Sequence, residues 1–371
     1  MRSAATMPPA AEEVLRRARY VPIQRLGHGG MAEVWLARAQ GPDGFQKEVA
    51  IKFPHGAFAE DPGFRARFLR EARLMAQMSH ANIAQVFELI DRDGCLAMVM
   101  EYVRGPSLRA LLTAERSGLP VAIACTIAAE LACGLAYAHD LRGPDGTSLG
   151  LVHRDVSPGN CVLSLDGEVK LIDFGIAAVD RELTQGGVVK GKLAYMSPEQ
   201  TRNDRLDARS DLFALGALLY ELLTGAPAFD GEDDAVIIDR LRRGETIPLR
   251  RRVADLSVEL EEAVHTALAP EAGDRFADAL AFRQALRPFT QGLGAPELGH
   301  FIRSRARDLP GSVPAEPTRA VTQQVDDGDI AALTDARVSS GGAWGFWLAL
   351  TFLLAPLVLG GITFVLWSLV R

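Results

Sequence analysis

Three side chains that could hold a metal ion lie in the stretch HRDVSPGNCVLSLDGEVKLIDFG, residues 153–175. Asn160 follows Asp155 by five residues, and the apolar run VKLI ends next to Asp173. An Asp-Gly turn signal between two apolar runs predicts a hairpin, which would bring both aspartates together. Two carboxylates and a carboxamide at one point suit Mg²⁺, which takes oxygen ligands. If one carboxylate and the carboxamide hold the metal, the other carboxylate can accept a proton from a hydroxyl; the alternative is an ordinary hairpin with solvated charges.

This segment resembles the catalytic and metal loops of eukaryotic-type protein kinases, H-R-D-x-x-x-x-N followed by D-F-G. The resemblance implies that Asp155 is the catalytic base and that Asn160 and Asp173 bind Mg²⁺. It covers roughly residues 20–289 and implies an α+β, bilobal fold. A small antiparallel β lobe with one helix would pack on a larger, mainly helical lobe, with ATP between them.

Residues 20–39 predict a strand, a glycine-rich turn and a second strand. Such a turn lets the backbone approach a phosphate closely, although tight hairpins use the same pattern. It resembles the kinase loop GxGxxGxV, with Ala32 in place of the third glycine, and no GK[ST] follows, which excludes a Walker A loop. The resemblance implies a hinge after the gatekeeper Met100. It assigns the following residues to ATP: Leu26, Gly27, His28, Gly29, Gly30, Val34, Ala50, Lys52, Glu101, Val103 and Val162.

The strand EVAIKF carries Lys52 at an otherwise apolar end, and a lysine in that position needs an anion. In the family pattern VAIK, this lysine binds the α- and β-phosphates and pairs with a glutamate on a helix. Residues 61–80 show the apolar periodicity of a helix, and Glu71 lies on its apolar face. A charge on that face favours Lys52 as its partner; the alternative is a surface pair with Arg67 or Arg70.

From Ser107 to Leu286 the sequence predicts mainly helices around the catalytic hairpin. The segment YMSPE resembles the A-P-E end of a peptide-docking loop, and the resemblance implies that Glu199 pairs with Arg275. Asp211 opens a strongly apolar helix and could cap its N-terminus. In the family, the aspartate at this position anchors the backbone of the catalytic loop.

The segment between the D-F-G and Y-M-S-P-E motifs is polar, contains several glycines and predicts a mobile loop. Thr184 is its one threonine and a candidate regulatory phosphosite. Arg154 could pair with a phosphate there and order the loop; the alternative is an inert, exposed threonine.

Two departures from the family pattern form a pair. The catalytic loop usually carries a lysine where Ser157 stands, and the loop before A-P-E usually begins Gly-Thr where this chain has Gly191-Lys192. The hydroxyl and the ammonium have exchanged places. If the fold brings the two positions together, Lys192 reaches the transferring phosphoryl from the other side and Ser157 hydrogen-bonds it. The alternative is a solvated loop lysine with a neutral loss at Ser157.

Composition limits the other classes of function. The chain has 371 residues, 48% of them apolar, which is enough for a large two-lobed domain with added segments. Its formal charge of −7 gives no support for a nucleic-acid partner. Its four cysteines form no CxxC pair, which favours thiols in a reducing compartment over a zinc site or disulfides. Residues 1–22 lack the apolar core of a secretory signal.

Four regions are expected along the chain: an N-terminal segment of weak order at 1–19, the kinase-like domain at 20–289, a largely disordered linker at 290–342 and a membrane anchor at 343–371.

The uncharged stretch 344–370 predicts a transmembrane helix. At about 1.5 Å per residue it spans about 40 Å, enough for a bilayer core of about 30 Å. Tryptophans lie near both ends, as interfacial aromatic residues do. The alternative is a buried soluble helix. Because the enzyme needs ATP, the expected arrangement is a single-pass protein of the cell membrane with a cytoplasmic kinase domain.

The resemblance as a whole implies a membrane-tethered protein kinase of the bacterial, eukaryotic-like (Hanks) type. Such an enzyme uses ATP and Mg²⁺ to phosphorylate serine and threonine hydroxyls of protein substrates, and it can autophosphorylate in a transient homodimer. Two alternatives remain open. One is a pseudokinase that binds nucleotide as a signalling scaffold; the presence of every metal and phosphate residue argues against it, and Ser157 in place of the usual lysine keeps it open. The other is a small-molecule phosphotransferase, against which the YMSPE segment argues.

Overall fold

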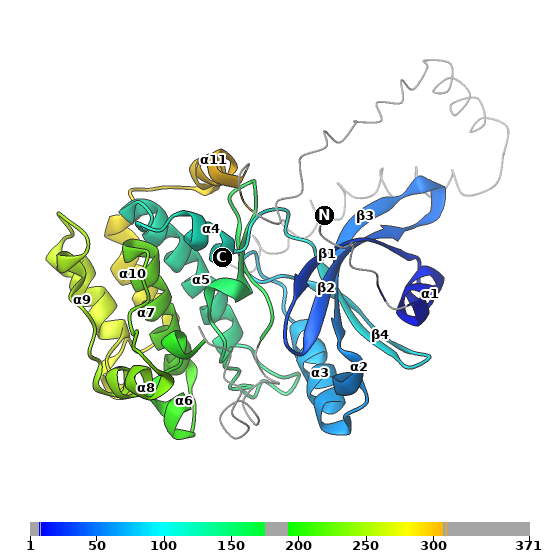
Figure 1. The fold of residues 1–371 in the computed structure, drawn as a ribbon, viewed down its shortest axis with the longest axis horizontal. Coiled ribbons are helices and arrows are strands. Elements are labelled where there is room, and N and C mark those ends of the chain that lie inside the picture. The colour runs from blue at the N-terminus through cyan, green and yellow to red at the C-terminus, as the bar shows by residue number, and fades with distance from the viewer. Residues whose placement is uncertain (1–6, 8, 175–191, 307–308, 310–371) are drawn as a thin grey trace, which may run out of the picture. The chain divides into compact units, whose positions relative to one another are not determined.

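The computed structural model describes residues 7, 9–174, 192–306 and 309. These residues form a sheet lobe and a mainly helical lobe (Figure 1). In the described part of the chain, five strands form one antiparallel sheet in the order β1-β2-β3-β5-β4. The strands are β1 (Tyr20–His28), β2 (Ala32–Gln40), β3 (Gln46–Pro54), β4 (Val86–Arg92) and β5 (Cys95–Glu101).

One face of the sheet packs against helix α3 (Pro62–Met75), which follows the short helix α2 (Gly56–Ala59). Asp61 caps α3, because its Oδ1 accepts hydrogen bonds from the backbone N–H groups of Gly63 and Phe64. The buried apolar face of α3 packs on Ala50, Leu96 and Met98 of the sheet. This face of the helix consists of Phe64, Phe68, Ala72 and Met75. The predicted helix and its buried face are confirmed.

The opposite face of the sheet is covered by helix α1 (Pro9–Arg17), which Figure 1 shows beside the strands. Leu15 is fully buried in a cluster with Trp35, Ile51 and Val99. The expectation of weak order throughout residues 1–19 is therefore wrong for this helix. The helix buries only two apolar side chains, Val14 and Leu15, but they cover a face of the sheet that would otherwise be exposed.

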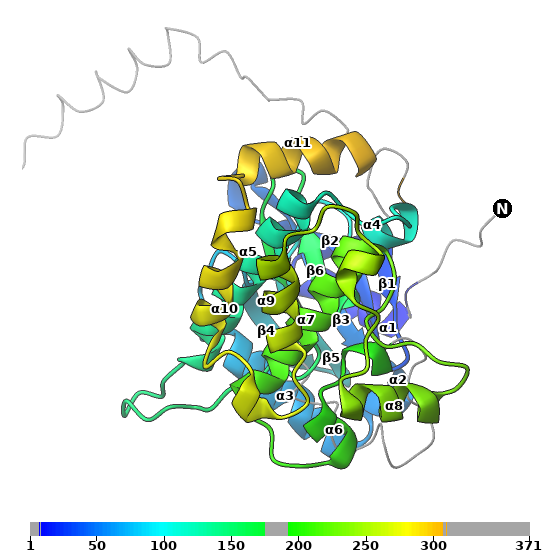
Figure 2. The same ribbon diagram turned by 90° about the vertical axis from the view of Figure 1, so that its left-hand side faces the viewer.

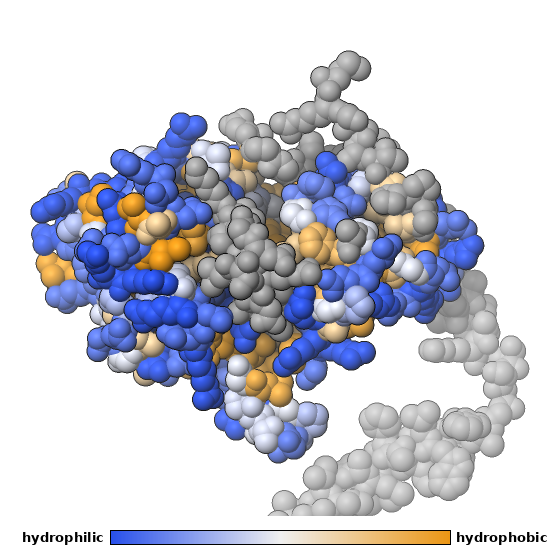
Figure 3. All heavy atoms as spheres, turned by 60° about the horizontal axis from the view of Figure 1, so that its bottom comes forward, coloured by the Kyte–Doolittle hydropathy of each residue, from blue (hydrophilic) through white to orange (hydrophobic). Residues whose placement is uncertain are grey.

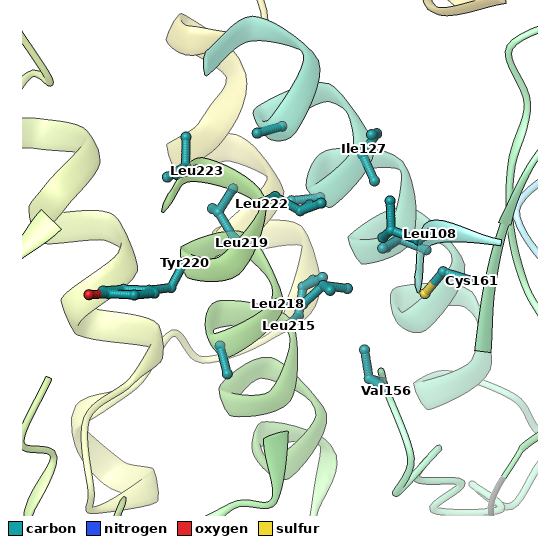
Figure 4. Close-up of a cluster of buried hydrophobic side chains, with 14 of the residues drawn as sticks. Leu108, Ile127, Val156, Cys161, Leu215, Leu218, Leu219, Tyr220, Leu222 and Leu223 are labelled. Atoms are coloured by element: carbon teal, nitrogen blue, oxygen red, sulfur yellow. The ribbon is translucent and has the colours of Figure 1, made fainter. Parts of the chain in front are cut away.

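The larger lobe is built around two long apolar helices, α5 and α7, whose side chains interlock in the core (Figure 4). Leu215 and Leu218 of α7 point toward Ile127 of α5 and Leu108, whereas Tyr220 points the other way and donates its hydroxyl to Ile247 O. The helices are α4 (Leu108–Ala114), α5 (Val121–His139), α6 (Pro198–Arg202), α7 (Ala208–Thr224), α8 (Asp234–Arg243), α9 (Val258–Ala267) and α10 (Ala279–Leu286). A two-stranded hairpin, β6 (Cys161–Leu163) and β7 (Val169–Leu171), completes the lobe.

A further helix, α11 (Ala295–Ala306), lies across one end of the helical lobe (Figure 2). Leu298 and Ile302 are buried in the same core as α5 and α7. Arg303 donates to Leu165 O, and Arg305 pairs with Glu115 at 3.1 Å. The expectation of a largely disordered linker from residue 290 is therefore wrong for residues 295–306, which belong to the helical lobe.

In the part of the chain that the structure describes, one helix has the length and apolar character of a membrane span. This helix is α5, and two thirds of its most apolar window are buried, as expected of a core helix. The stretch 344–370 lies outside the described residues. Hydrophilic side chains dominate the face of both lobes in Figure 3, with smaller hydrophobic patches between them.

Candidate active site

A cleft of about 320 Å³ lies between the two lobes. Apolar side chains from both lobes line it, among them Val34 of β2, Ala50 of β3 and Val162 of β6. An apolar slot of this size with few polar groups suits a nucleotide base. Seven of the residues that the sequence assigns to ATP line the cleft, together with Met100: Leu26, Gly27, Val34, Ala50, Glu101, Val103 and Val162.

The tip of the glycine-rich turn, residues 28–30, is outside this lining and is held by a residue that the sequence did not indicate. His55 Nε2 lies 2.8 Å from Gly29 O, and the backbone N–H of His55 donates to Met31 O at 2.9 Å. The rings of His28 and His55 lie 4.8 Å apart. Gly29 and Met31 are thus hydrogen-bonded to His55 in the connection after β3, and the ring of His28 contacts the same residue.

The hinge residue Glu101 is tied to the helical lobe through its side chain. Glu101 Oε1 pairs with Lys170 Nζ at 2.9 Å, and its backbone N–H donates to Gln85 O at 2.8 Å. The backbone group that Glu101 can offer a nucleotide is therefore its carbonyl. Lys170 is buried in the apolar strand β7, so the argument applied to Lys52 would have predicted an anionic partner for it as well.

Lys52 lies within a cluster of charges beside the cleft. Its Nζ is 3.0 Å from Asp173 Oδ1 and 3.6 Å from Glu71 Oε1, so the predicted Lys52–Glu71 pair is present. Burial alone would lower the pKa of Lys52, but Asp173 and Glu71 outweigh it and raise this pKa. Burial raises the pKa of Glu71 to about 7, and Lys52 offsets this only in part because its ammonium lies closer to Asp173. A lysine held in its charged form suits phosphate binding.

The predicted hairpin of β6 and β7 is confirmed, and it brings the acidic residues together. Ile172 N–H donates to Asn160 O at 2.9 Å, which places Asp173 beside Asn160. Asn160 Nδ2 donates to Asp155 Oδ2 at 2.7 Å and to Asp155 O at 2.8 Å. Because Nδ2 donates to Asp155, the Oδ1 atom is the part of the Asn160 carboxamide that can coordinate a metal ion.

The carboxylate of Asp173 fits a divalent cation. Its Oδ1 is buried, and its contact with Lys52 lacks hydrogen-bond geometry. Among the described residues, this oxygen has no hydrogen-bond donor. A buried carboxylate oxygen without a donor, next to a carboxamide oxygen, matches the hard oxygen ligands that Mg²⁺ prefers.

The backbone of the catalytic loop is fixed by the buried side chain of Asp211. Its carboxylate accepts hydrogen bonds from the backbone N–H groups of His153 and Arg154, at 2.7 and 2.8 Å, and from His139 Nε2 at 2.7 Å. Burial would raise the pKa of Asp211, but these donors, above all His139, lower it. They hold Arg154 in the left-handed region at φ 69°, which a non-glycine residue adopts only when its surroundings fix it.

Phe174 orients the metal-binding end of the hairpin. It is fully buried in the cluster beneath α3, where it packs with Met75 and Met98. Its ring centroid is 4.4 Å from that of His153, so the two motifs H-R-D and D-F-G are in direct contact. This packing turns Asp173 toward Lys52.

The docking segment Y-M-S-P-E is anchored by a buried ion pair, as the resemblance implies. Arg275 donates two parallel hydrogen bonds to Glu199, at 2.7 and 2.9 Å. Ser210 Oγ donates to the same carboxylate at 2.6 Å. Burial would raise the pKa of Glu199, but the hydrogen bonds from Arg275 and Ser210 outweigh it and lower this pKa.

The two departures from the family pattern also lie at this site. Lys192 Nζ donates to Asp155 Oδ2 at 2.7 Å, and Ser157 is buried in the loop between Asp155 and Asn160. Thr184, the candidate phosphosite, lies outside the described residues.

The family model of the protein kinase domain matches residues 20–288. The chain belongs to this family. Members of the family use ATP with Mg²⁺, which agrees with the fit of Asn160 and Asp173 to a cation. The matched residues therefore include both lobes described above except helices α1 and α11.

Similar proteins come from several bacteria. The tyrosine-protein kinase MasK of Myxococcus xanthus is 41% identical over 295 residues, which are 76% of this chain and 45% of that protein. The serine/threonine-protein kinase PknB of Mycolicibacterium smegmatis is 34% identical over 335 residues, 88% of this chain and 52% of that protein. The crystal structure of the PknI kinase domain from Mycobacterium tuberculosis is 30% identical, has a TM-score of 0.55 and covers 78% of this chain and 99% of that domain. The chain spans about half the length of these curated relatives.

Proposed function

We propose that this chain phosphorylates serine and threonine hydroxyls of other proteins, with ATP as phosphoryl donor. One observation carries the proposal: Lys52, Asp155, Asn160 and Asp173 converge beside an apolar cleft that suits a nucleotide base. The relatives named PknB support the choice of serine and threonine, whereas MasK is named a tyrosine kinase.

The roles of the residues follow from their positions. Asn160 and Asp173 would hold Mg²⁺, which supplies positive charge to the phosphates when bound. Lys52 binds phosphate oxygens and is itself positioned by Glu71. Asp155 orients the acceptor hydroxyl and takes its proton as the oxygen attacks. Most of the catalysis is then orientation and charge neutralisation.

The test is incubation of the purified chain with labelled ATP, Mg²⁺ and a generic protein substrate, followed by phosphoamino-acid analysis. Phosphoserine and phosphothreonine are expected, and their loss in Asp155→Asn would assign them to this site. Phosphotyrosine alone would overturn the choice of hydroxyl. Nucleotide binding without any transfer would instead identify a pseudokinase scaffold. A rate of autophosphorylation per molecule that rises with protein concentration is expected if the transient homodimer forms.

The proposal includes attachment to the cell membrane by the anchor at 343–371, with the kinase domain in the cytoplasm. The support is the uncharged stretch 344–370 and its terminal tryptophans. The full chain is expected to sediment with membranes and to need detergent for release, whereas deletion of residues 343–371 should give an active kinase in the supernatant. A full-length chain that stays in the supernatant without detergent would contradict the anchor.

A further inference from the structure

Lys192 is in direct contact with the carboxylate that faces the acceptor hydroxyl. Its Nζ lies 2.7 Å from Asp155 Oδ2, the same oxygen that accepts a hydrogen bond from Asn160 Nδ2 at 2.7 Å. The pair is partly shielded, since the side chain of Lys192 is 34% exposed and that of Asp155 is 16% exposed. An ion pair in this setting is screened less than one in bulk water.

The backbone of Lys192 is held by a buried turn. The next three residues, Leu193–Tyr195, form a short 3₁₀ helix whose side chains are all buried in the helical lobe. The backbone N–H of Tyr195 donates a hydrogen bond to Lys192 O at 3.1 Å. The Tyr195 hydroxyl donates to Glu221 and accepts a hydrogen bond from Arg109. The ammonium therefore approaches Asp155 from a fixed point of the fold.

Lys192 is the side chain that supplies positive charge next to Asp155 in the described part of the chain. Ser157, two residues after Asp155, is buried and uncharged, while Lys52 is engaged with Asp173 and Glu71. Among the described residues, Lys192 is the one whose cation lies within ion-pair distance of Asp155. The oxygen that Asp155 orients is the one that attacks phosphorus, so a cation on Asp155 is also next to the phosphoryl oxygens.

We propose that Lys192 is a catalytic residue that neutralises charge on the transferring phosphoryl; the inference rests on the proposed kinase function. In the step, the hydroxyl oxygen forms a bond to the γ-phosphorus and the bond from that phosphorus to the β,γ-bridging oxygen breaks. ADP leaves with the electron pair, and the hydroxyl proton passes to Asp155. Lys192 gives up no proton and stabilises the negative charge spread over the oxygens in the transition state.

The test replaces the ammonium by a side chain of similar length. Lys192→Met should lower kcat by about 10² or more, equivalent to about 2.7 kcal/mol, while the Kd for ADP changes little. The affinity for ADP with aluminium fluoride, a mimic of the transferring phosphoryl, should fall by a similar factor. Lys192→Arg should retain more kcat than Lys192→Met. The matched control is Lys47→Met, an exposed lysine at the start of β3, which should leave kcat unchanged.

The exchange with Ser157 gives a second, independent measurement. Lys192→Thr combined with Ser157→Lys should recover at least tenfold in kcat over Lys192→Thr alone, as a double-mutant cycle would show. The inference is overturned if the kcat of Lys192→Met lies within about threefold of wild type. It is also overturned if this variant loses as much affinity for ADP as it loses in kcat, because that would indicate a structural role. A wild-type chain that binds ATP and transfers no phosphate would refute the proposed function instead.

Discussion

The carboxyl group of Glu71 allows the charge cluster around Lys52 to be tested without any substrate. Glu71 is 3% exposed, and its pKa is raised from 4.5 to about 7, with burial as the main cause. The folded protein therefore holds a proton at Glu71 more tightly than the unfolded chain does. The resulting contribution to the free energy of unfolding is complete below about pH 4.5 and is lost as the pH rises through about 7.

The size of the effect follows from this difference in pKa. At about 1.36 kcal/mol for each pKa unit, the step from 4.5 to about 7 corresponds to about 3 kcal/mol. Glu71→Gln keeps the side chain neutral at every pH. The stability of this variant relative to the wild type should therefore grow by about 2 kcal/mol between pH 5 and pH 8.

Urea unfolding at the two pH values, in EDTA and without nucleotide, measures the change. Glu259→Gln, an exposed residue in the first turn of α9, is the matched control and should show no such growth. If the free energies of unfolding of Glu71→Gln and the wild type differ by the same amount at both pH values, Glu71 stays ionised beside Lys52. That result would refute the reasoning. The same variant should lose about tenfold or more in kcat/KM for ATP, because Lys52 loses a charged partner.

Two further predictions concern the catalytic loop and the docking segment. Asp155→Asn and Asp173→Asn should each lower kcat by about 10³ or more. Only Asp173→Asn should greatly raise the Mg²⁺ concentration needed for ATP binding. If both variants need the same Mg²⁺ concentration, the division of roles is contradicted. Arg275→Ala leaves the Glu199 carboxylate buried without its cation and should destabilise the protein by about 3–5 kcal/mol in urea unfolding. Arg243→Ala, whose ion pair is exposed, should cost about 1 kcal/mol or less, and similar losses in both variants would refute this argument.

The contact between Lys52 and Glu71 could be predicted because each residue places a charge in an apolar segment. Lys52 lies in an apolar strand and Glu71 on the apolar face of a helix, and a buried charge needs a partner of opposite sign. The same argument would have found Lys170, which lies in the apolar strand β7 and pairs with Glu101. His55 could not be found in this way, because it bonds a backbone carbonyl and carries no buried charge that would call for a partner.

The edges of the domain could not be predicted, because they depend on contacts between distant segments. Helix α11 mixes polar and apolar residues without a long apolar run, and its docking requires two glycines. A Cβ at Gly167 would lie 1.8 Å from Ala295 O, and a Cβ at Gly299 would lie 2.9 Å from the backbone of Asp166. No local signal in a single sequence shows that the turn before β7 and a helix about 130 residues later approach so closely. Helix α1 is similar, since Leu15 is buried only because Trp35 and its neighbours form a matching face.

Both the sequence and the fold are needed to interpret the exchange of Ser157 and Lys192. The sequence indicates that one position has lost a charge and another has gained one, but a separation of 35 residues leaves their distance open. The buried turn at Leu193–Tyr195 and the Asp211 anchor of the catalytic loop settle it, because together they fix both backbones around Asp155. A charge that acts in the transition state is defined by its place relative to the reacting atoms. An ammonium from either segment can therefore serve the same phosphoryl oxygens, provided that the fold holds it rigidly against Asp155.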